Sequence, residues 1–214
     1  MKRGLFIVFE GGEGAGKSVQ TQMLANRLRQ AGKKVVVTRE PGGTRIGEQI
    51  RAITHNTENV DLDPVAEAYL MAASRAQHVR ETIAPALEDG KIVISDRFVD
   101  SSIAYQGFGR NLGVKEIAAL NELAVNGANS DLVILLDVPT KVGLERLERE
   151  GKQKDRLDMQ QKDFYDRVHE GYLALAKNNS SRYVVVDATK SMEEVASSIW
   201  KIVTDVLKKR NGNE

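Results

Sequence analysis

Near its amino terminus the chain carries the stretch LFIVFEGGEGAGKS, residues 5–18. Its first part, Leu5 to Phe9, is apolar without interruption, which is typical of a strand buried on both faces. The segment Gly11 to Ser18 follows and fits the pattern G-x-x-x-x-G-K-[ST]. Behind it, apolar residues at helical spacing begin with Val19, Met23, Leu24 and Leu28. Strand, glycine loop and helix in this order predict a phosphate-binding loop, or P-loop, in an α/β domain.

Each residue type of the glycine loop has a role in holding a nucleoside triphosphate. Glycines let successive backbone N–H groups converge on phosphate oxygens, and the amino terminus of the helix adds partial positive charge. Lys17 would reach the β- and γ-phosphates, and the Ser18 hydroxyl would ligate Mg²⁺. The predicted ATP-binding loop consists of Gly11, Gly12, Glu13, Gly14, Ala15, Gly16, Lys17 and Ser18. The alternative is a glycine-rich turn with an incidental lysine, which the flanking strand and helix disfavour.

Four further short apolar runs follow along the chain, at 35–38, 92–94, 132–136 and 183–186. They are continuous rather than alternating, as in strands with both faces covered, and the segments between them are long enough for crossover helices. Ser191 and Glu194 form a capping box before a carboxy-terminal helix, whose apolar positions are Val195, Ile199, Ile202 and Val206. Strands that alternate with helices predict a three-layer α/β fold around one parallel sheet.

Composition and charge narrow the function classes. The 214 residues include 31 Lys or Arg and 30 Asp or Glu, and this net charge of +1 argues against a general nucleic-acid coat protein. With 41% hydrophobic and 29% charged residues, the chain has the composition of a globular domain. The absence of cysteine excludes disulfides, thiolate catalysis and Cys-ligated metal sites. We therefore expect a single domain over residues 1–214 that binds no nucleic acid.

The amino-terminal segment resembles a signal peptide only superficially. Lys2 and Arg3 precede the apolar run Leu5–Phe9, but Glu10 ends this run far short of the apolar core of a signal peptide. The apolar runs of this chain are also far shorter than the roughly 20 residues needed to cross a bilayer. A buried first strand fits the segment better, and we predict a cytoplasmic protein without a membrane partner.

A second acidic residue is predicted to hold the metal. The run at 92–94 ends in the sequence Ser-Asp-Arg, in which Asp96 would hold Mg²⁺ directly or through its waters. Asp137 closes the next apolar run in the same way and is the alternative. Asp96 is preferred because Arg97 beside it supplies a phosphate-binding fork at the carboxyl edge of the sheet. The predicted metal ligands are therefore Ser18 and Asp96.

The variable positions 12–15 of the P-loop include no basic residue, so charge on a transferred phosphoryl group needs an arginine from elsewhere. The segment 148–158 is rich in charges and poor in apolar residues, and we predict a mobile lid there. This region carries the basic side chains Arg146, Arg149, Lys152, Lys154 and Arg156. Such a loop is usually only solvated, but a lid that closes an arginine over the phosphates would supply the missing charge.

Several longer segments are more specific than the P-loop alone, namely Phe9–Gly11, Thr38–Gly43, Ala73–Arg75, Asp96–Phe98, Asp100–Gly107 and Asp155–Asp158. Together they resemble the bacterial thymidylate kinases over nearly the whole chain. The resemblance implies a P-loop nucleoside monophosphate kinase fold, with a five-stranded parallel sheet flanked by helices, and a homodimer. It also implies transfer of the γ-phosphoryl group of Mg-ATP to dTMP, giving dTDP and ADP in dTTP biosynthesis. Since a nucleotide phosphate is already anionic at neutral pH, this reaction needs no general base.

The resemblance also implies roles for individual residues at the acceptor. Arg39 and Arg97 would hold the dTMP phosphate with Arg51 nearby, and Glu13 would approach the sugar 3′-hydroxyl. Arg75 would donate to thymine, although Arg51 and Arg75 on probable helices would by themselves be typical of solvated faces. The implied substrate-binding set is Glu13, Arg39, Glu40, Arg51, Met71, Arg75, Arg97, Ser102, Tyr105 and Gln106.

Three of these residues would contact the base and the sugar. Ser102 and Gln106 match polar partners of thymine, and Tyr105 matches a ring that lies beneath the sugar and disfavours a 2′-hydroxyl. At the donor, the turn formed by Asp187, Ala188 and Thr189 resembles the turn beside adenine, which adds it to the ATP-binding residues. The catalytic set that the resemblance implies is Lys17, Arg97, Arg149 and Arg156.

One position departs from the family pattern and keeps an alternative open. Met71 stands where the family commonly has a phenylalanine stacked on the base, and a thioether can also lie against a ring. A monophosphate kinase with another base preference is therefore the second hypothesis. A GTP-binding switch protein needs Asn-Lys-x-Asp and Asp-x-x-Gly, but Val99 and Thr140 stand three residues after Asp96 and Asp137. A purely structural P-loop domain would leave the arginine set without a role.

Overall fold

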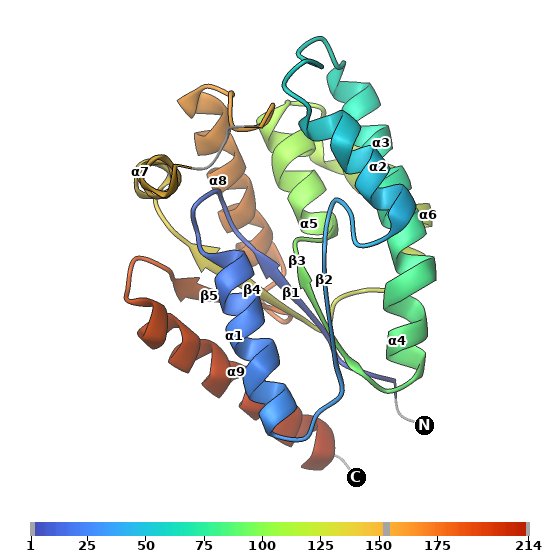
Figure 1. The fold of residues 1–214 in the computed structure, drawn as a ribbon, viewed down its shortest axis with the longest axis vertical. Coiled ribbons are helices and arrows are strands. Elements are labelled where there is room, and N and C mark those ends of the chain that lie inside the picture. The colour runs from blue at the N-terminus through green and yellow to red at the C-terminus, as the bar shows by residue number, and fades with distance from the viewer. Residues whose placement is uncertain (1–2, 152–154, 213–214) are drawn as a thin grey trace.

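The central sheet has five parallel strands in the order β2-β3-β1-β4-β5 (Figure 1). In this computed structural model, which describes residues 3–151 and 155–212, the strands are β1 Phe6–Glu10, β2 Val35–Arg39, β3 Ile92–Asp96, β4 Leu132–Asp137 and β5 Tyr183–Asp187. The predicted strands are confirmed. Each continues past its predicted end to a charged residue, because these residues still pair with a neighbouring strand at the carboxyl edge.

β1 lies in the middle of the sheet, with β3 on one side and β4 on the other. The chain leaves β1 toward the half that contains β2 and β3, and later returns to the half that contains β4 and β5. The strand order therefore reverses at β1, and in open α/β sheets ligands bind at the carboxyl edge where this happens. The P-loop follows β1 directly, so it opens at the centre of that edge.

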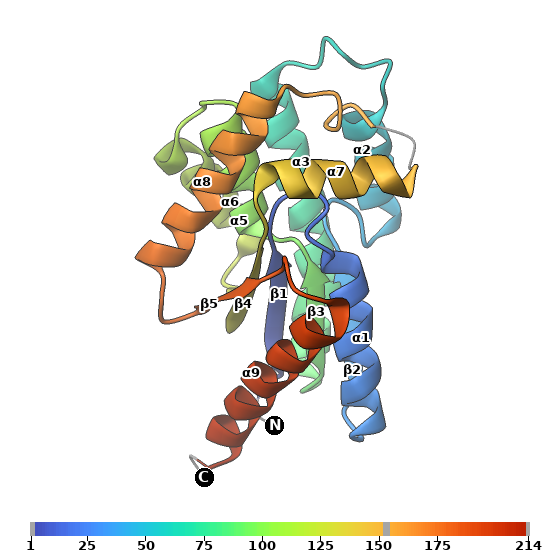
Figure 2. The same ribbon diagram turned by 90° about the vertical axis from the view of Figure 1, so that its left-hand side faces the viewer.

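Helices cover both faces of the sheet, and alternate residues of β1 face the two helical layers. Ile7 and Phe9 belong to a core with α1 (Lys17–Gln30) and α9 (Met192–Gly212), which lie side by side in Figures 1 and 2. Phe6 and Val8 belong to a second core. The helices that contribute to it include α3 Pro64–His78, α4 Ala84–Glu88, α6 Val114–Val125 and α8 Lys162–Asn178. The predicted three-layer α/β fold is confirmed.

The remaining elements lie around the carboxyl edge. α2 Arg45–His55 follows β2, and two π-helical turns, η1 Val79–Ile83 and η2 Ile103–Gly109, continue α3 and the short α5 Val99–Ser102. α7 Thr140–Glu150 follows β4 and crosses above the ends of the strands (Figure 2). It packs directly on the P-loop, because a Cβ added to Gly14 would lie 2.1 Å from the carbonyl oxygen of Gly143. Only a glycine at each of these two positions allows this approach.

Some local details test the sequence patterns. The capping box is confirmed, since Ser191 Oγ accepts from Glu194 N at 3.3 Å and the Glu194 carboxylate accepts from Ser191 N at 3.1 Å. Val19 is 49% exposed, because it lies in the first turn of α1 beside the P-loop rather than against the sheet. β2 and β5 are partly exposed, since helices cover the edges of the sheet less fully than its middle. Within the described residues, no helix combines the length and apolar character that crossing a bilayer requires.

Candidate active site

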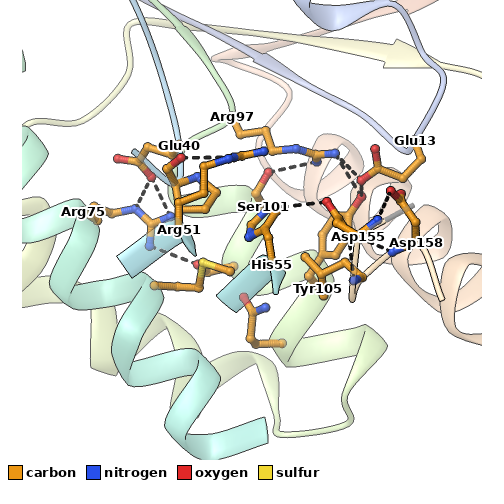
Figure 3. A pocket seen from close by; sticks show the side chains of 15 residues that line it. Glu13, Glu40, Arg51, His55, Arg75, Arg97, Ser101, Tyr105, Asp155 and Asp158 are labelled. Carbon is orange, nitrogen blue, oxygen red and sulfur yellow. Dashed lines mark hydrogen bonds and ion pairs between the residues drawn. The ribbon is translucent and has the colours of Figure 1, made fainter. Parts of the chain in front are cut away.

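Two cavities meet at the carboxyl edge of the sheet. The first, which we call the P-loop cavity, is lined by residues 13–19 together with Asp96 and residues from β2, α2 and α7. The second, the inner cavity, lies between α2, α3, η2 and the turn 155–158, and Figure 3 shows its lining side chains. Four charged residues line both cavities, namely Glu13, Glu40, Arg51 and Arg97. A ligand in one cavity would therefore lie within reach of charges that also face the other.

Lys17 is held inside the P-loop by the backbone of the loop itself. Its ammonium group donates to the carbonyl oxygens of Gly11 at 3.0 Å and Gly12 at 2.7 Å, and the residue is 7% exposed. Burial, together with the positive charge of Arg97, lowers the pKa of Lys17 to about 8. The lysine is thus a desolvated cation whose charge an incoming anion would stabilise.

Ser18 and Asp96 lie together at the mouth of the P-loop cavity. Ser18 Oγ donates to Asp96 Oδ2 at 2.5 Å, so a hydroxyl from α1 and a carboxylate from β3 face the same point. Both are hard oxygen donors, and Mg²⁺ in nucleotide sites typically takes only one or two protein ligands besides phosphate and water. The alternative carboxylate, Asp137, contacts His169 Nε2 at 2.7 Å instead and does not line this cavity. The pair therefore fits the predicted magnesium site.

Arg97 bridges the two cavities from an unusual backbone conformation. Its φ of 70° is left-handed, which a non-glycine residue adopts only when its surroundings hold it there. The guanidinium donates to Glu13 Oε1 at 2.6 Å and to the Tyr105 hydroxyl at 3.1 Å (Figure 3). It also donates to the Tyr172 hydroxyl at 3.1 Å. Burial opposes the charged guanidinium, but Glu13 and the tyrosines raise its pKa well above the ordinary value. Arg97 is therefore a permanent cation next to an acid that lines both cavities.

A buried carboxylate behind Arg97 was given no role by the sequence patterns. Glu10, at the end of β1, accepts from Phe98 N at 2.9 Å, from Ser101 Oγ at 2.6 Å and from the Tyr172 hydroxyl at 3.0 Å. Burial and the nearby charge of Asp100 raise the pKa of Glu10 to about 7. These bonds fix the turn that contains Arg97. The available signal was an acidic residue that directly ends a continuous apolar strand.

The inner cavity contains a second arginine, Arg75, whose guanidinium N–H groups are all hydrogen-bonded to the protein. Arg75 is 3% exposed and donates through Nε to Glu40 at 2.8 Å and through Nη1 to Ser102 Oγ at 3.0 Å. Its other donors reach Asn121, the Phe98 carbonyl and again Glu40, so each N–H of the guanidinium has an acceptor. The expectation from helical pattern alone, a solvated Arg75, is wrong because the carboxylate of Glu40 is buried beside it.

The region predicted as a lid contains the end of α7 and a turn. α7 extends to Glu150, residues 152–154 with Lys152 and Lys154 lie outside the described residues, and the chain forms a turn at 155–158. The Asp155 carboxylate accepts from Leu157 N at 2.8 Å and from Asp158 N at 3.0 Å, which closes this turn on the inner cavity. Arg156, which was predicted to act from the lid, is 4% exposed and paired with the buried Glu67 of α3.

The two arginines of α7, Arg146 and Arg149, differ in their contacts. Arg149 is 79% exposed and pairs with Glu145 at 3.5 Å along the surface of α7. Arg146, one turn earlier, donates to the carbonyl oxygen of Gly14 at 3.4 Å and so reaches the P-loop. It was noted among the basic residues of the region but was not included in the catalytic set. Arg146 precedes Arg149 by about one helical turn, but this spacing could not indicate a contact with the P-loop until the position of α7 was known.

The remaining predicted residues lie in the P-loop cavity, in the inner cavity and at the end of β5. Arg39 and Arg51 line the P-loop cavity, where Arg39 pairs with Glu48 at 2.9 Å and Arg51 donates to the Pro41 carbonyl at 3.2 Å. Met71, Ser102, Tyr105 and Gln106 line the inner cavity. The predicted adenine turn at 187–189 follows β5, where Asp187 accepts from Thr189 Oγ1 at 2.6 Å and Ala188 N donates to the Asp137 carbonyl at 2.8 Å. Neither cavity is lined by this turn.

Comparisons with known proteins point to one family. The family model described as thymidylate kinase matches residues 9–199. A thymidylate kinase of Pelotomaculum thermopropionicum is 46% identical over 205 residues, covering 96% of this chain and 95% of that protein. A thymidylate kinase of Geobacillus species strain WCH70 is 46% identical over 210 residues, covering 97% of this chain and 100% of that protein. The crystal structure of thymidylate kinase from Ehrlichia chaffeensis is 32% identical with a TM-score of 0.77, covering 94% of this chain and 99% of that chain.

Proposed function

The chain belongs to the thymidylate kinase family, and from this premise we propose how its two cavities carry out the transfer of the γ-phosphoryl group from ATP to dTMP. The reaction gives dTDP and ADP. The P-loop cavity holds the phosphates of ATP, and the inner cavity holds dTMP with its phosphate toward Arg97. The observation that carries this proposal is that Glu13, Arg51 and Arg97 line both cavities, at the point where donor and acceptor phosphates must meet.

At the donor, Lys17 exchanges its bonds to the loop carbonyls for bonds to the β- and γ-phosphates. Ser18 and Asp96 would hold Mg²⁺, which would neutralise part of the phosphate charge. Arg146 supports the same phosphates from α7, since it already reaches the P-loop backbone. The predicted contribution of Arg149 requires its end of α7 to move toward the loop. The turn Asp187, Ala188 and Thr189 remains the candidate for adenine.

At the acceptor, the dTMP phosphate replaces Glu13 as the partner of Arg97, with Arg39 and Arg51 on either side. Two polyanions must approach each other, and these cations lower the repulsion along the line of transfer. No side chain has to remove a proton, because the second pKa of a phosphate monoester is about 6. Glu13, once released by Arg97, turns with Tyr105 to the sugar.

The base occupies the deep end of the inner cavity. Met71 lies against its face, and Ser102 and Gln106 hydrogen-bond its edge. Because each donor of Arg75 already has a protein acceptor, its main task here is to hold Ser102 and Glu40 in place. Thymine shares one of these donors rather than receiving a free one. Arg156 is assigned to this end of the site, through Glu67, and not to the phosphates.

Residues 1–214 form a single domain in this proposal, and the family resemblance extends to a homodimer in the cytoplasm. Large apolar side chains support the dimer, because they are exposed on α3 and on the two helices that pack against it, α2 and α6. These side chains are Ile53, Val65, Tyr69 and Leu123, of which Leu123 is 79% exposed. Light scattering on the purified chain tests this part, and Leu123→Glu with Tyr69→Glu should convert a dimer to monomers. A wild-type chain that stays monomeric at micromolar concentration contradicts it.

The acceptor assay tests the proposed division between the cavities. Formation of ADP from ATP should rise steeply with dTMP and far less with CMP, GMP or the ribonucleotide TMP. Arg97→Ala should lower kcat while the chain remains folded, since Arg97 acts on charge in transfer. Unchanged turnover in that variant would remove Arg97 from the mechanism, and equal stimulation by all monophosphates would overturn the assignment of the inner cavity.

A further inference from the structure

Glu67, in the first turn of α3, is a fully buried carboxylate on which donors from different segments converge. Oε1 accepts from Gln106 Nε2 at 2.9 Å. Arg110 donates to Oε1 from Nε at 3.3 Å and to Oε2 from Nη2 at 3.0 Å, and Arg156 also donates to Oε2. Glu67 lines neither the inner cavity nor the P-loop cavity, so it does not touch substrate itself.

The ionisation of Glu67 limits what Gln106 can do. Burial alone would raise the pKa of Glu67, but the hydrogen bonds from Arg110 and Arg156 lower it below the ordinary value. The carboxylate therefore stays ionised, and an ionised carboxylate only accepts hydrogen bonds. Gln106 can face it only through the amide nitrogen. Oε1 is then the hydrogen-bond acceptor that Gln106 can offer to a base in the inner cavity.

We propose that Glu67 is a positioning residue that determines base specificity: it fixes the Gln106 amide so that a hydrogen-bond acceptor faces ring position 3 of the pyrimidine. This inference rests on the proposed placement of the base in the inner cavity. Thymine and uracil carry an N–H at that position, whereas cytosine carries a lone pair. An oriented carbonyl oxygen accepts from the first two and repels the third. A site whose acceptor loses its partner rejects the analogue strongly.

The Glu67 carboxylate also connects the Gln106 amide to the turn 155–158, which closes the inner cavity. Arg156 donates to the Thr54 carbonyl at 2.8 Å as well as to Glu67, and its backbone N–H donates to the His55 carbonyl at 3.1 Å. The end of α2, the turn 155–158 and η2 therefore meet at Glu67. The orientation of Gln106 and the position of the closing turn depend on one buried charge.

The decisive variant is Glu67→Gln in the full chain, because a glutamine offers both a donor and an acceptor and lets the Gln106 amide rotate. We expect the ratio of kcat/KM for dTMP to kcat/KM for dCMP to fall roughly 10- to 100-fold, the effect of one buried hydrogen bond. The ratio for dTMP against dUMP should not change, since uracil keeps the N–H. A purely structural role would lower kcat/KM for all three acceptors by the same factor, and that result would overturn the proposal.

Two controls isolate the acceptor character of residue 67. Glu67→Asp remains an ionised acceptor and should keep most of the preference for dTMP over dCMP. If Glu67→Asp and Glu67→Gln lose this preference equally, the proposed role of Glu67 is wrong. Glu81→Gln is the matched change outside the site. Glu81 also accepts from a glutamine nitrogen, Gln77 Nε2, at 2.6 Å, but on the surface. That variant should keep both ratios, and a comparable loss there would contradict a specific role for Glu67.

Gln106→Leu distinguishes a failure of this proposal from a failure of the proposed placement of the base in the inner cavity. If Gln106→Leu leaves the dTMP to dCMP ratio unchanged, the base does not bind at Gln106 and the placement itself is wrong. If Gln106→Leu lowers the ratio but Glu67→Gln does not, only the role of Glu67 fails. Should Glu67→Gln not fold, Glu67→Gln with Arg110→Gln keeps the net charge of the buried cluster and gives the same measurement with the same outcomes.

Discussion

The base end and the phosphate end of the site hold charge in opposite ways. At the base end, Glu40, Glu67 and Arg75 are almost fully buried and their polar atoms are taken up by one another and by neighbouring groups. At the phosphate end, Arg39 has a side chain that is 53% exposed, and Lys17 donates to backbone carbonyls of the P-loop. The first set is complete without a ligand, and the second is arranged around partners that a phosphate can replace.

The difference follows from what each end must distinguish. Bases differ by one donor or acceptor, so their recognition needs polar groups that cannot turn, and buried saturated networks provide this. Phosphates carry the same charge whatever nucleotide they belong to. The protein therefore needs cationic side chains that can exchange their present partners for phosphate at little cost in free energy. Changes at the base end should therefore cost mainly stability, and changes at the phosphate end should cost mainly turnover.

The largest expected effect on folding comes from Arg75→Met. In the described part of the chain, this change leaves the buried Glu40 with only His78 as a charged or polar side-chain partner. Removing one member of a buried ion pair costs about 3–5 kcal/mol in the free energy of unfolding. Urea denaturation measures it. Arg39→Met is the matched control at the phosphate end, and it should cost less than about 1 kcal/mol because its pair with Glu48 is exposed. Equal losses in the two variants would break the comparison.

Lys17→Met should have the converse effect. We expect kcat to fall about 100- to 1000-fold, since a charge that acts on the transition state is lost. The free energy of unfolding at pH 7 should stay the same or rise, because burial already lowers the pKa of Lys17 to about 8 and so disfavours its charged form. Lys33→Met on the surface is the control for both measurements. A destabilised Lys17→Met with normal turnover would assign Lys17 to the fold instead.

The pH dependence of the donor site sharpens the same contrast. In the free enzyme Lys17 is protonated below its pKa of about 8, and only this form attracts the phosphates of ATP. Above that pH the value of kcat/KM for ATP should fall about tenfold per unit, or about 1.4 kcal/mol. Lys17→Arg keeps its charge at all these pH values, so its profile should be flat however low its rate is. A wild-type profile that stays flat to pH 10 would contradict the lowered pKa.

Met71→Phe should have the smallest effect and the opposite sign. An aromatic ring in place of the thioether adds a flat face against the base, worth about 0.5–1.5 kcal/mol. The KM for dTMP should therefore fall between about twofold and tenfold with kcat unchanged. Met159→Phe, on a side chain that is 57% exposed and outside the inner cavity, is the control. A KM that does not change in Met71→Phe would show that residue 71 does not stack on the base.

Sequence patterns predicted the parts of this site whose neighbours along the chain position them. Gly11 to Ser18 were identified because strand, loop and helix are consecutive, and Ser18 and Asp96 were paired because parallel strands end at one edge. The family resemblance then selected Arg75, Ser102 and Gln106, which do line one cavity. It also selected Arg156 for the phosphates, whereas the structure pairs this residue with Glu67.

By itself, then, the sequence determined the sheet, the P-loop and the caps, because apolar period and glycine placement act through local geometry. Only the tertiary structure decided which charged residues are buried. Four charged residues look like ordinary polar positions in the sequence, yet the structure buries all of them: Glu10, Glu67, Arg75 and Arg156. A charge can leave water only where a partner offsets its desolvation, and these partners lie far away in sequence, 35 residues for Arg75 and Glu40 and 89 for Arg156 and Glu67. No local pattern contains that information, since it arises when the folded helices bring the partners together.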